Sequence, residues 1–176
     1  TSKDSTVSVV ATSTTANGIT DIGEYIFRNA VPEQAAVAAA IRESHKGLGY
    51  KTAAVLYSNN DDQMVSVNKI AQETLAAEGV QVVATETFAN KDTDFSAQLT
   101  KIQQANPDVI VVAALYQEGS LIMKKMREMG MNQPVIGSNG FNSPQFIQTA
   151  GDAANGAIVG TPWFPNKDDQ KVKDFK

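Results

Sequence analysis

The chain has 176 residues, of which 42% are hydrophobic and 19% charged, with a formal net charge of −4, one histidine and no cysteine. This length suits one domain with a substantial core, and a chain with so many apolar residues is not disordered. The missing cysteines exclude disulfide frameworks and thiolate sites, and an acidic chain without a Lys/Arg cluster argues against duplex nucleic acid as a partner.

The first apolar segment, residues 7–11, is strand-like but is not followed by a helix pattern. Small and polar residues occupy 12–20, and a second short apolar stretch follows at 25–28. We expect this segment to belong to a neighbouring lobe.

From residue 52 onward, β-rich apolar runs recur at a near-constant interval, with helix-length segments between them. The run VIVVA at 109–113 is continuously apolar, as expected for a parallel sheet covered by helices on both faces. The fold class is therefore α/β, a three-layer α/β/α parallel sheet. The longest apolar run, 109–115, is far shorter than the roughly 18 residues of a membrane-spanning helix. The predicted strands cover residues 52–57, 80–84, 109–113, 134–136 and 157–160.

Helix start and stop signals mark the intervening segments. Pro32 predicts a start at residue 33, and Gly47 predicts the end of that helix. Gly79 and Gly130 stand where left-handed caps end two later helices, and Asn106-Pro107 ends another that Asp94 caps. The predicted helices cover 33–46, 62–78, a segment after Asp94, 118–129, and a short stretch after Ser143-Pro144. Met123, Met126, Met129 and Met131 have the spacing of core packing.

The motifs of common enzymes are missing. The sequence contains no G-x-S-x-G, H-E-x-x-H or Walker A motif. His45 lies in the last turn of a predicted helix, where a positive charge complements the helix dipole, so we expect it to be structural. Gly47-Leu48-Gly49 precedes a strand instead of following one, which is the wrong context for a dinucleotide fingerprint. We therefore expect no enzyme activity, no cofactor and no metal.

Asp61-Asp62 after the 52–57 strand raises one alternative, a Mg²⁺-dependent phospho-acceptor site of the receiver-domain kind. Such a site also needs an Asp ending another strand and a Lys ending a later one. Residues 115–117 and 138–140 occupy those places without them. Helix capping is therefore the favoured role for these carboxylates.

Open parallel sheets bind ligands beyond the carboxyl ends of their strands. Here those ends combine neutral hydrogen-bonding groups with aromatic rings, which suits recognition of a small polar ligand better than acid–base chemistry. The strand ends carry Ser58, Asn59, Asn60 and Asp61, then Thr87 and Phe88, then Tyr116, Gln117 and Glu118, then Ser138, Asn139, Gly140 and Phe141, then Thr161 and Trp163.

Several stretches share the order and spacing of one protein family. They are Phe27-Arg28, 94–102, 107–110, 130–140 and 150–156. Together they resemble the extracytoplasmic solute-binding proteins of ABC importers, in particular the leucine/isoleucine/valine-binding group with the type I periplasmic-binding fold. The resemblance spans about residues 7–165.

Proteins of that family have two Rossmann-like α/β lobes joined by a hinge, with the ligand trapped between them, and this chain resembles the second lobe. The resemblance implies a crossing strand from the missing first lobe and hinge at 1–19. It also implies a second ligand-binding lobe at 20–165 and a truncated connection toward the first lobe at 166–176.

The resemblance also implies which residues bind the ligand. In leucine-binding members this lobe holds the ligand's ammonium group through an acidic residue in a Gly-x-[Asp/Glu]-Gly turn and through aromatic residues after two strands. Asn139 occupies the acidic position, where it accepts a hydrogen bond without supplying charge. Glu118 or Asp61 is the candidate for the missing charge, and Leu115 is an alternative to Tyr116 as the strand-end contact. The predicted ligand-binding residues are Tyr116, Asn139, Gln117, Asn60, Asp61, Asp62, Leu115 and Gly140.

The implied function is that of the substrate-binding component of an ABC importer for a branched-chain or similar amino acid. Such a protein works outside the cytoplasm, in the periplasm or lipid-anchored at the cell surface, and its partner is the ABC permease. The alternative is a ligand-sensing domain of a signalling receptor or regulator with the same fold.

Overall fold

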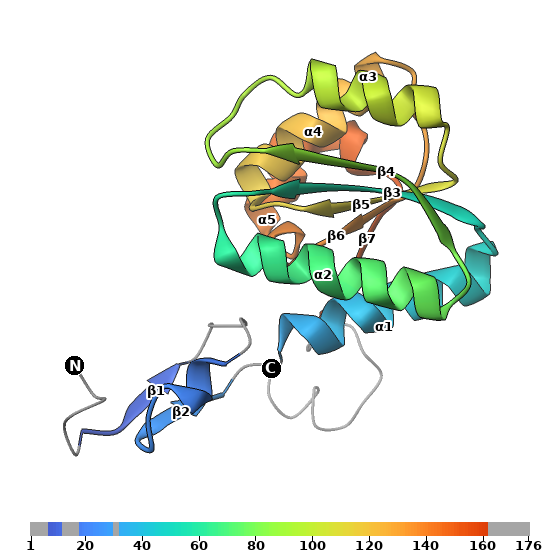
Figure 1. Cartoon of the computed structure of the whole chain (residues 1–176). Helices are drawn as coiled ribbons and strands as arrows, with labels where there is room; N and C mark the ends of the chain where they lie inside the picture. Colours follow the sequence, from blue (N-terminus) through green and yellow to red (C-terminus); the bar gives the residue numbers. More distant parts are fainter. Residues whose placement is uncertain (1–6, 12–17, 30–31, 162–176) are drawn as a thin grey trace, which may run out of the picture.

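The computed structural model describes residues 7–11, 18–29 and 32–161 (Figure 1). The predicted connection at 166–176 and the strand-end residue Trp163 lie outside the described residues, as do parts of the segment 1–19.

A five-stranded parallel sheet forms the centre of the molecule, with the strand order β4-β3-β5-β6-β7. The prediction of a parallel α/β sheet is confirmed. β4 extends beyond its predicted end at residue 84, because as an edge strand it tolerates polar residues on its partly exposed face. The strands are β3 (Thr52–Ser58), β4 (Gln81–Phe88), β5 (Val109–Ala113), β6 (Val135–Gly137) and β7 (Ala157–Val159).

Helices cover both faces of this sheet (Figure 1). One core lies beneath α1 and α2 and includes Ile41, Val67 and Leu75. The other lies beneath α3, α4 and α5 and includes Met123, Met126 and Met131, which confirms their predicted packing role. The helices are α1 (Glu33–Leu48), α2 (Asp62–Ala77), α3 (Ser96–Ala105), α4 (Tyr116–Glu128) and α5 (Pro144–Ala150).

Most helix ends follow the predicted signals, but α4 begins at Tyr116 instead of residue 118, and the N-cap of α3 is Phe95 instead of Asp94. The predicted end of α1 at Gly47 was wrong, since the helix continues to Leu48 and Gly49 adopts the left-handed conformation, with φ 65°. Only the second glycine of this pair takes the positive φ that ends a helix. Gly79 and Gly130 have positive φ as predicted, at 74° and 76°. The Asp94 carboxylate accepts hydrogen bonds from Ser96 N and Oγ at the start of α3.

A second, two-stranded parallel sheet is formed by β1 (Val9–Ala11) and β2 (Ile26–Arg28), separate from the main sheet (Figure 1). Several of its apolar side chains are exposed, including Phe27 at 51%. Within the described ranges, no helix has both the length and the apolar character needed to cross a membrane.

Candidate functional site

The carboxyl ends of the parallel strands bring most of the predicted site residues to one edge of the sheet. β5 lies between β3 and β6, so the residues that follow these three strands are neighbours. We call this region the strand-end edge and define it by residues 58–62, 87–92, 115–118 and 138–141.

The loops after β3 and β4 are joined through Asn60 and Asn90. Asn60 Oδ1 accepts a hydrogen bond from Asn90 N at 2.8 Å. The Ser58 hydroxyl lies 2.9 Å from Asn60 Oδ1 and 2.6 Å from Asn90 Oδ1, and its single proton serves one of them at a time. Asn60, a predicted ligand-binding residue, therefore holds the loop that contains Asn90. Asn90 could not be predicted from the sequence, because nothing in a polar loop indicates a partner 30 positions away.

Asp61 caps α2, as the favoured sequence interpretation predicted. Its Oδ1 accepts hydrogen bonds from Gln63 N at 2.9 Å and from Met64 N at 3.2 Å. Its Oδ2 accepts one from Asn90 Nδ2 at 3.2 Å. Both carboxylate oxygens are occupied by the protein, whereas neighbouring Asp62 is exposed in the first turn of α2.

The residues after β5 differ in exposure, since some face solvent and others pack against the core. Leu115 is 40% exposed and Gln117 is also exposed at the start of α4. Tyr116 is half-buried and packs against the core beneath α3 to α5. Of the two candidates at this strand end, Leu115 is thus the more accessible for contact with a ligand.

Glu118 is a buried carboxylate, 3% exposed. Its Oε1 accepts a hydrogen bond from Lys91 N at 2.9 Å, at a residue with the unusual φ of 75°. Its Oε2 has no hydrogen-bond partner among the described residues. The structure thus places this predicted source of charge beneath the loop that follows β4.

The turn that carries Asn139 is fitted closely against the end of β5. Ser138 Oγ donates to Ala114 O at 2.7 Å. A Cβ added at Gly140 would lie 2.5 Å from the same carbonyl oxygen, so only glycine fits at this predicted site position. A Cβ at Gly137 would lie 2.3 Å from the Phe141 ring, which is itself buried and stacked on Phe146. Close packing therefore fixes the backbone around half-exposed Asn139.

Glu33, which the sequence analysis did not single out, also contacts this turn. It is 3% exposed, and its Oε1 accepts a hydrogen bond from Asn139 N at 2.7 Å. Its Oε2 accepts one from Gln63 Nε2 at 3.4 Å. In a parallel α/β sheet the helices run antiparallel to the strands, so the first residue of α1 lies at the strand-end edge. That topological rule is the signal that could have pointed to Glu33.

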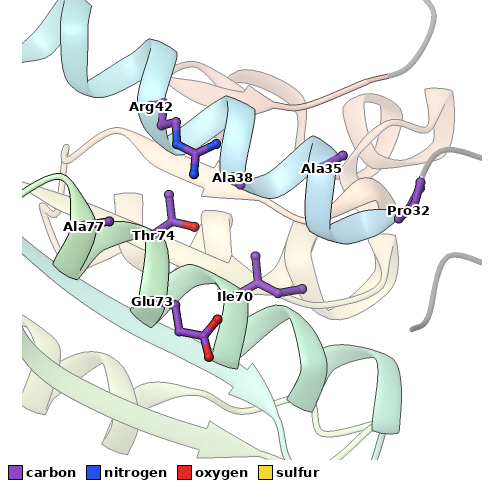
Figure 2. Close-up of a pocket in the computed structure, with 8 residues that line it drawn as sticks. All are labelled: Pro32, Ala35, Ala38, Arg42, Ile70, Glu73, Thr74 and Ala77. Atoms are coloured by element: carbon purple, nitrogen blue, oxygen red, sulfur yellow. The ribbon is translucent and has the colours of Figure 1, made fainter. Parts of the chain in front are cut away.

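A separate groove lies between α1 and α2 (Figure 2). It contains none of the eight predicted ligand-binding residues. Its charged side chains are Arg42, which pairs with Glu78 at 3.5 Å, and Glu73. The groove is lined by Pro32, Ala35, Ala38, Arg42, Ile70, Glu73, Thr74 and Ala77.

The chemistry available at the strand-end edge is hydrogen bonding and apolar contact. Asn139 and Gln117 supply amides, Asp62 a carboxylate and Leu115 an aliphatic surface. No group of three or more His, Cys, Asp or Glu residues in the described ranges is arranged to hold a metal ion. The loops that carry these side chains are held by hydrogen bonds and close packing, as in preformed binding sites.

Comparison with known proteins identifies relatives along the whole chain. The family described as "Periplasmic binding protein" matches residues 2–176. The leucine-, isoleucine-, valine-, threonine- and alanine-binding protein of Pseudomonas aeruginosa is 26% identical over 164 residues, which cover 91% of this chain and 43% of that protein. The Leu/Ile/Val-binding protein BraC3 of Rhizobium johnstonii is 32% identical over 85 residues, which cover 48% of this chain and 23% of that protein.

Solved structures of amino-acid-binding proteins also superimpose on this chain. The leucine-binding protein LivK of Thermotoga maritima superimposes with a TM-score of 0.91 and 26% identity, over 99% of this chain and 50% of that one. LivJ of Streptococcus pneumoniae, solved in complex with isoleucine, has a TM-score of 0.79 and 30% identity, over 86% of this chain and 43% of that one. The chain therefore spans half or less of the length of these relatives.

Proposed function

The chain belongs to the type I periplasmic binding protein family, and from that premise we propose that it is one ligand-binding lobe of a receptor for an aliphatic amino acid. In this proposal residues 20–165 form the second of two lobes, and 1–19 and 166–176 connect it to the first. The ligand binds between the lobes at the strand-end edge and is released to an ABC permease outside the cytoplasm. The family binds solutes, and we propose that this chain likewise catalyses no reaction.

The observation that carries the proposal is the closely packed, hydrogen-bonded turn that contains Asn139. The turn packs closely against the end of β5 through Gly137 and Gly140 and through the hydrogen bond of Ser138. Exposed Leu115 lies next to it. Rigid loops that present a few polar groups beside an apolar surface are typical of small-molecule sites. An aliphatic amino acid offers the matching groups, since its ammonium donates hydrogen bonds and its side chain is apolar.

The names of the relatives support the ligand class. The Pseudomonas protein is named for leucine, isoleucine, valine, threonine and alanine. The Streptococcus structure contains isoleucine. Asn139 offers an amide oxygen to an ammonium group, so we expect weaker binding than with a carboxylate at this position.

A thermal-shift panel on the two-lobe protein tests the proposal. A ligand at about 100 times its dissociation constant adds roughly 2.7 kcal/mol of stability, which raises the melting temperature measurably. We expect L-leucine, L-isoleucine, L-valine or L-alanine to raise the melting temperature of the wild type, and to raise that of Asn139→Ala by less.

The matched control is Asn132→Ala, which changes an exposed asparagine just before β6. We expect the amino acids to raise the melting temperature of this variant as much as that of the wild type. A wild-type protein that gains no stability from any of the four amino acids would contradict the proposal.

A further inference from the structure

The turn after β6 begins with a backbone donor that its own local structure cannot satisfy. Residues Asn139–Phe141 form a short 3₁₀ helix. Phe141 N donates to Ser138 O and Asn142 N to Asn139 O, whereas Asn139 N lies at the start of the helix, where no preceding carbonyl is in reach. An acceptor from elsewhere is needed to fix this end of the turn.

Glu33 supplies that acceptor across 106 positions of sequence, with a distance of 2.7 Å from Oε1 to Asn139 N. Its side chain is buried, and Gln63 Nε2 contacts its other oxygen at 3.4 Å. Three segments that are far apart in the sequence therefore meet at one carboxylate: the first residue of α1, the first turn of α2 and the turn after β6.

We propose that Glu33 is a positioning residue for ligand binding, whose carboxylate fixes the backbone of the Asn139 turn in the orientation that receives the ligand. This inference rests on the proposed function, because it assigns a role within the same site. Glu33 is 3% exposed, and its two oxygens accept hydrogen bonds from Asn139 N and Gln63 Nε2, so we expect its contribution to reach the ligand through Asn139.

The charge and the acceptor oxygen of Glu33 have separable effects. A negative charge in the first turn of α1 stabilises that helix whether or not a ligand binds. Glu33→Gln and Glu33→Ala both remove this charge, but only Glu33→Ala also removes the acceptor for Asn139 N. Comparison of the two variants therefore isolates the positioning role.

The test is calorimetric titration of the two-lobe protein with L-leucine, L-isoleucine and L-valine. We expect Glu33→Ala to raise the dissociation constant by about 10-fold or more, as the loss of a hydrogen bond to a charged group implies. We expect Glu33→Gln to stay within about threefold of the wild type, because its amide oxygen still accepts from Asn139 N. Glu43→Ala, an exposed change later in α1, serves as the control.

A second measurement does not depend on the ligand. We expect amide hydrogen exchange in residues 138–141 to be faster in Glu33→Ala than in the wild type or Glu33→Gln, with β5 unchanged. The inference would be overturned by a dissociation constant of Glu33→Ala within twofold of the wild-type value. It would also be overturned if amide exchange in this turn were unchanged in Glu33→Ala. A wild-type protein that binds none of the three amino acids would instead contradict the proposed function, while the exchange experiment still decides the role of Glu33.

Discussion

Asp61 stabilises two neighbouring segments through one carboxylate, the first turn of α2 and the loop after β4. We expect Asp61→Ala to lower the free energy of unfolding by about 1 kcal/mol or more, because it leaves the first amides of α2 without a cap. Urea denaturation measures this change. Asp61→Asn is the control, because asparagine caps helices nearly as well, and it should stay within about 0.5 kcal/mol of the wild type. Equal losses in both variants would contradict the capping role.

In the proposed site, Asn139 is the residue that accepts a hydrogen bond from the ligand's ammonium group. We expect Asn139→Asp in the two-lobe protein to bind aliphatic amino acids several-fold more tightly, since a charge-assisted hydrogen bond is roughly twice as strong as a neutral one. Calorimetric titration gives the dissociation constants. A variant that binds these amino acids more weakly than the wild type would show that the ammonium group does not lie at this turn.

At the scale of elements, local signals made most of the fold predictable. β5 was visible as a continuous apolar run, and Gly79 marked the end of α2. In the candidate site, the location of Asn139 and Leu115 at the strand-end edge could be predicted, because each lies two residues after a strand. Glu33 was missed because its contact with Asn139 spans 106 positions, and only the assembled sheet brings the two together.

Asp108 joins the start of β5 to β3. Its Oδ2 accepts hydrogen bonds from Lys51 N and Thr52 N at 2.8 and 2.9 Å, and these bonds lower the pKa of the carboxyl below its ordinary value of 3.8. The ionised form therefore stabilises the folded state above pH 3.8, and this contribution is lost as the pH falls through the lower folded-state pKa.

Asp108→Asn should accordingly be less stable than the wild type at pH 7, by a small margin because solvent screens the exposed carboxylate. The difference should shrink as the pH falls below 3.8. Urea denaturation across this range measures it, with Asp152→Asn as an exposed control. A difference that stays constant with pH would show that the Asp108 charge contributes nothing.

Two glycines should respond in opposite ways to alanine. Gly140→Ala would place a methyl group 2.5 Å from Ala114 O, so we expect a loss of about 1–3 kcal/mol and weaker ligand binding. Gly47 lies inside α1 with open space around it, so Gly47→Ala should stabilise the protein by roughly 0.5–1 kcal/mol. Thermal denaturation compares them, and a Gly140→Ala variant as stable as the wild type would contradict this account of the turn.

At the scale of the whole molecule, we expect the small sheet of β1 and β2 to be stabilised by the first lobe of the proposed two-lobe protein. A two-stranded sheet is marginally stable by itself, and Phe27 and Val10 are exposed on it. We expect the amides of Val9–Ala11 and Ile26–Arg28 to exchange rapidly in the 176-residue chain and to be protected in the two-lobe protein. Hydrogen exchange with mass spectrometry measures both, with β5 as the internal control. Equal protection in the two proteins would contradict a role for this unit in joining the lobes.

Binding of an amino acid at the strand-end edge should be visible in hydrogen exchange of the two-lobe protein with and without saturating L-leucine, L-isoleucine, L-valine or L-alanine in turn. We predict that at least one of them slows exchange at residues 115–118 and 138–141 and leaves exchange in the groove between α1 and α2 unchanged. Protection confined to that groove, or no change with any of the four amino acids, would contradict this prediction.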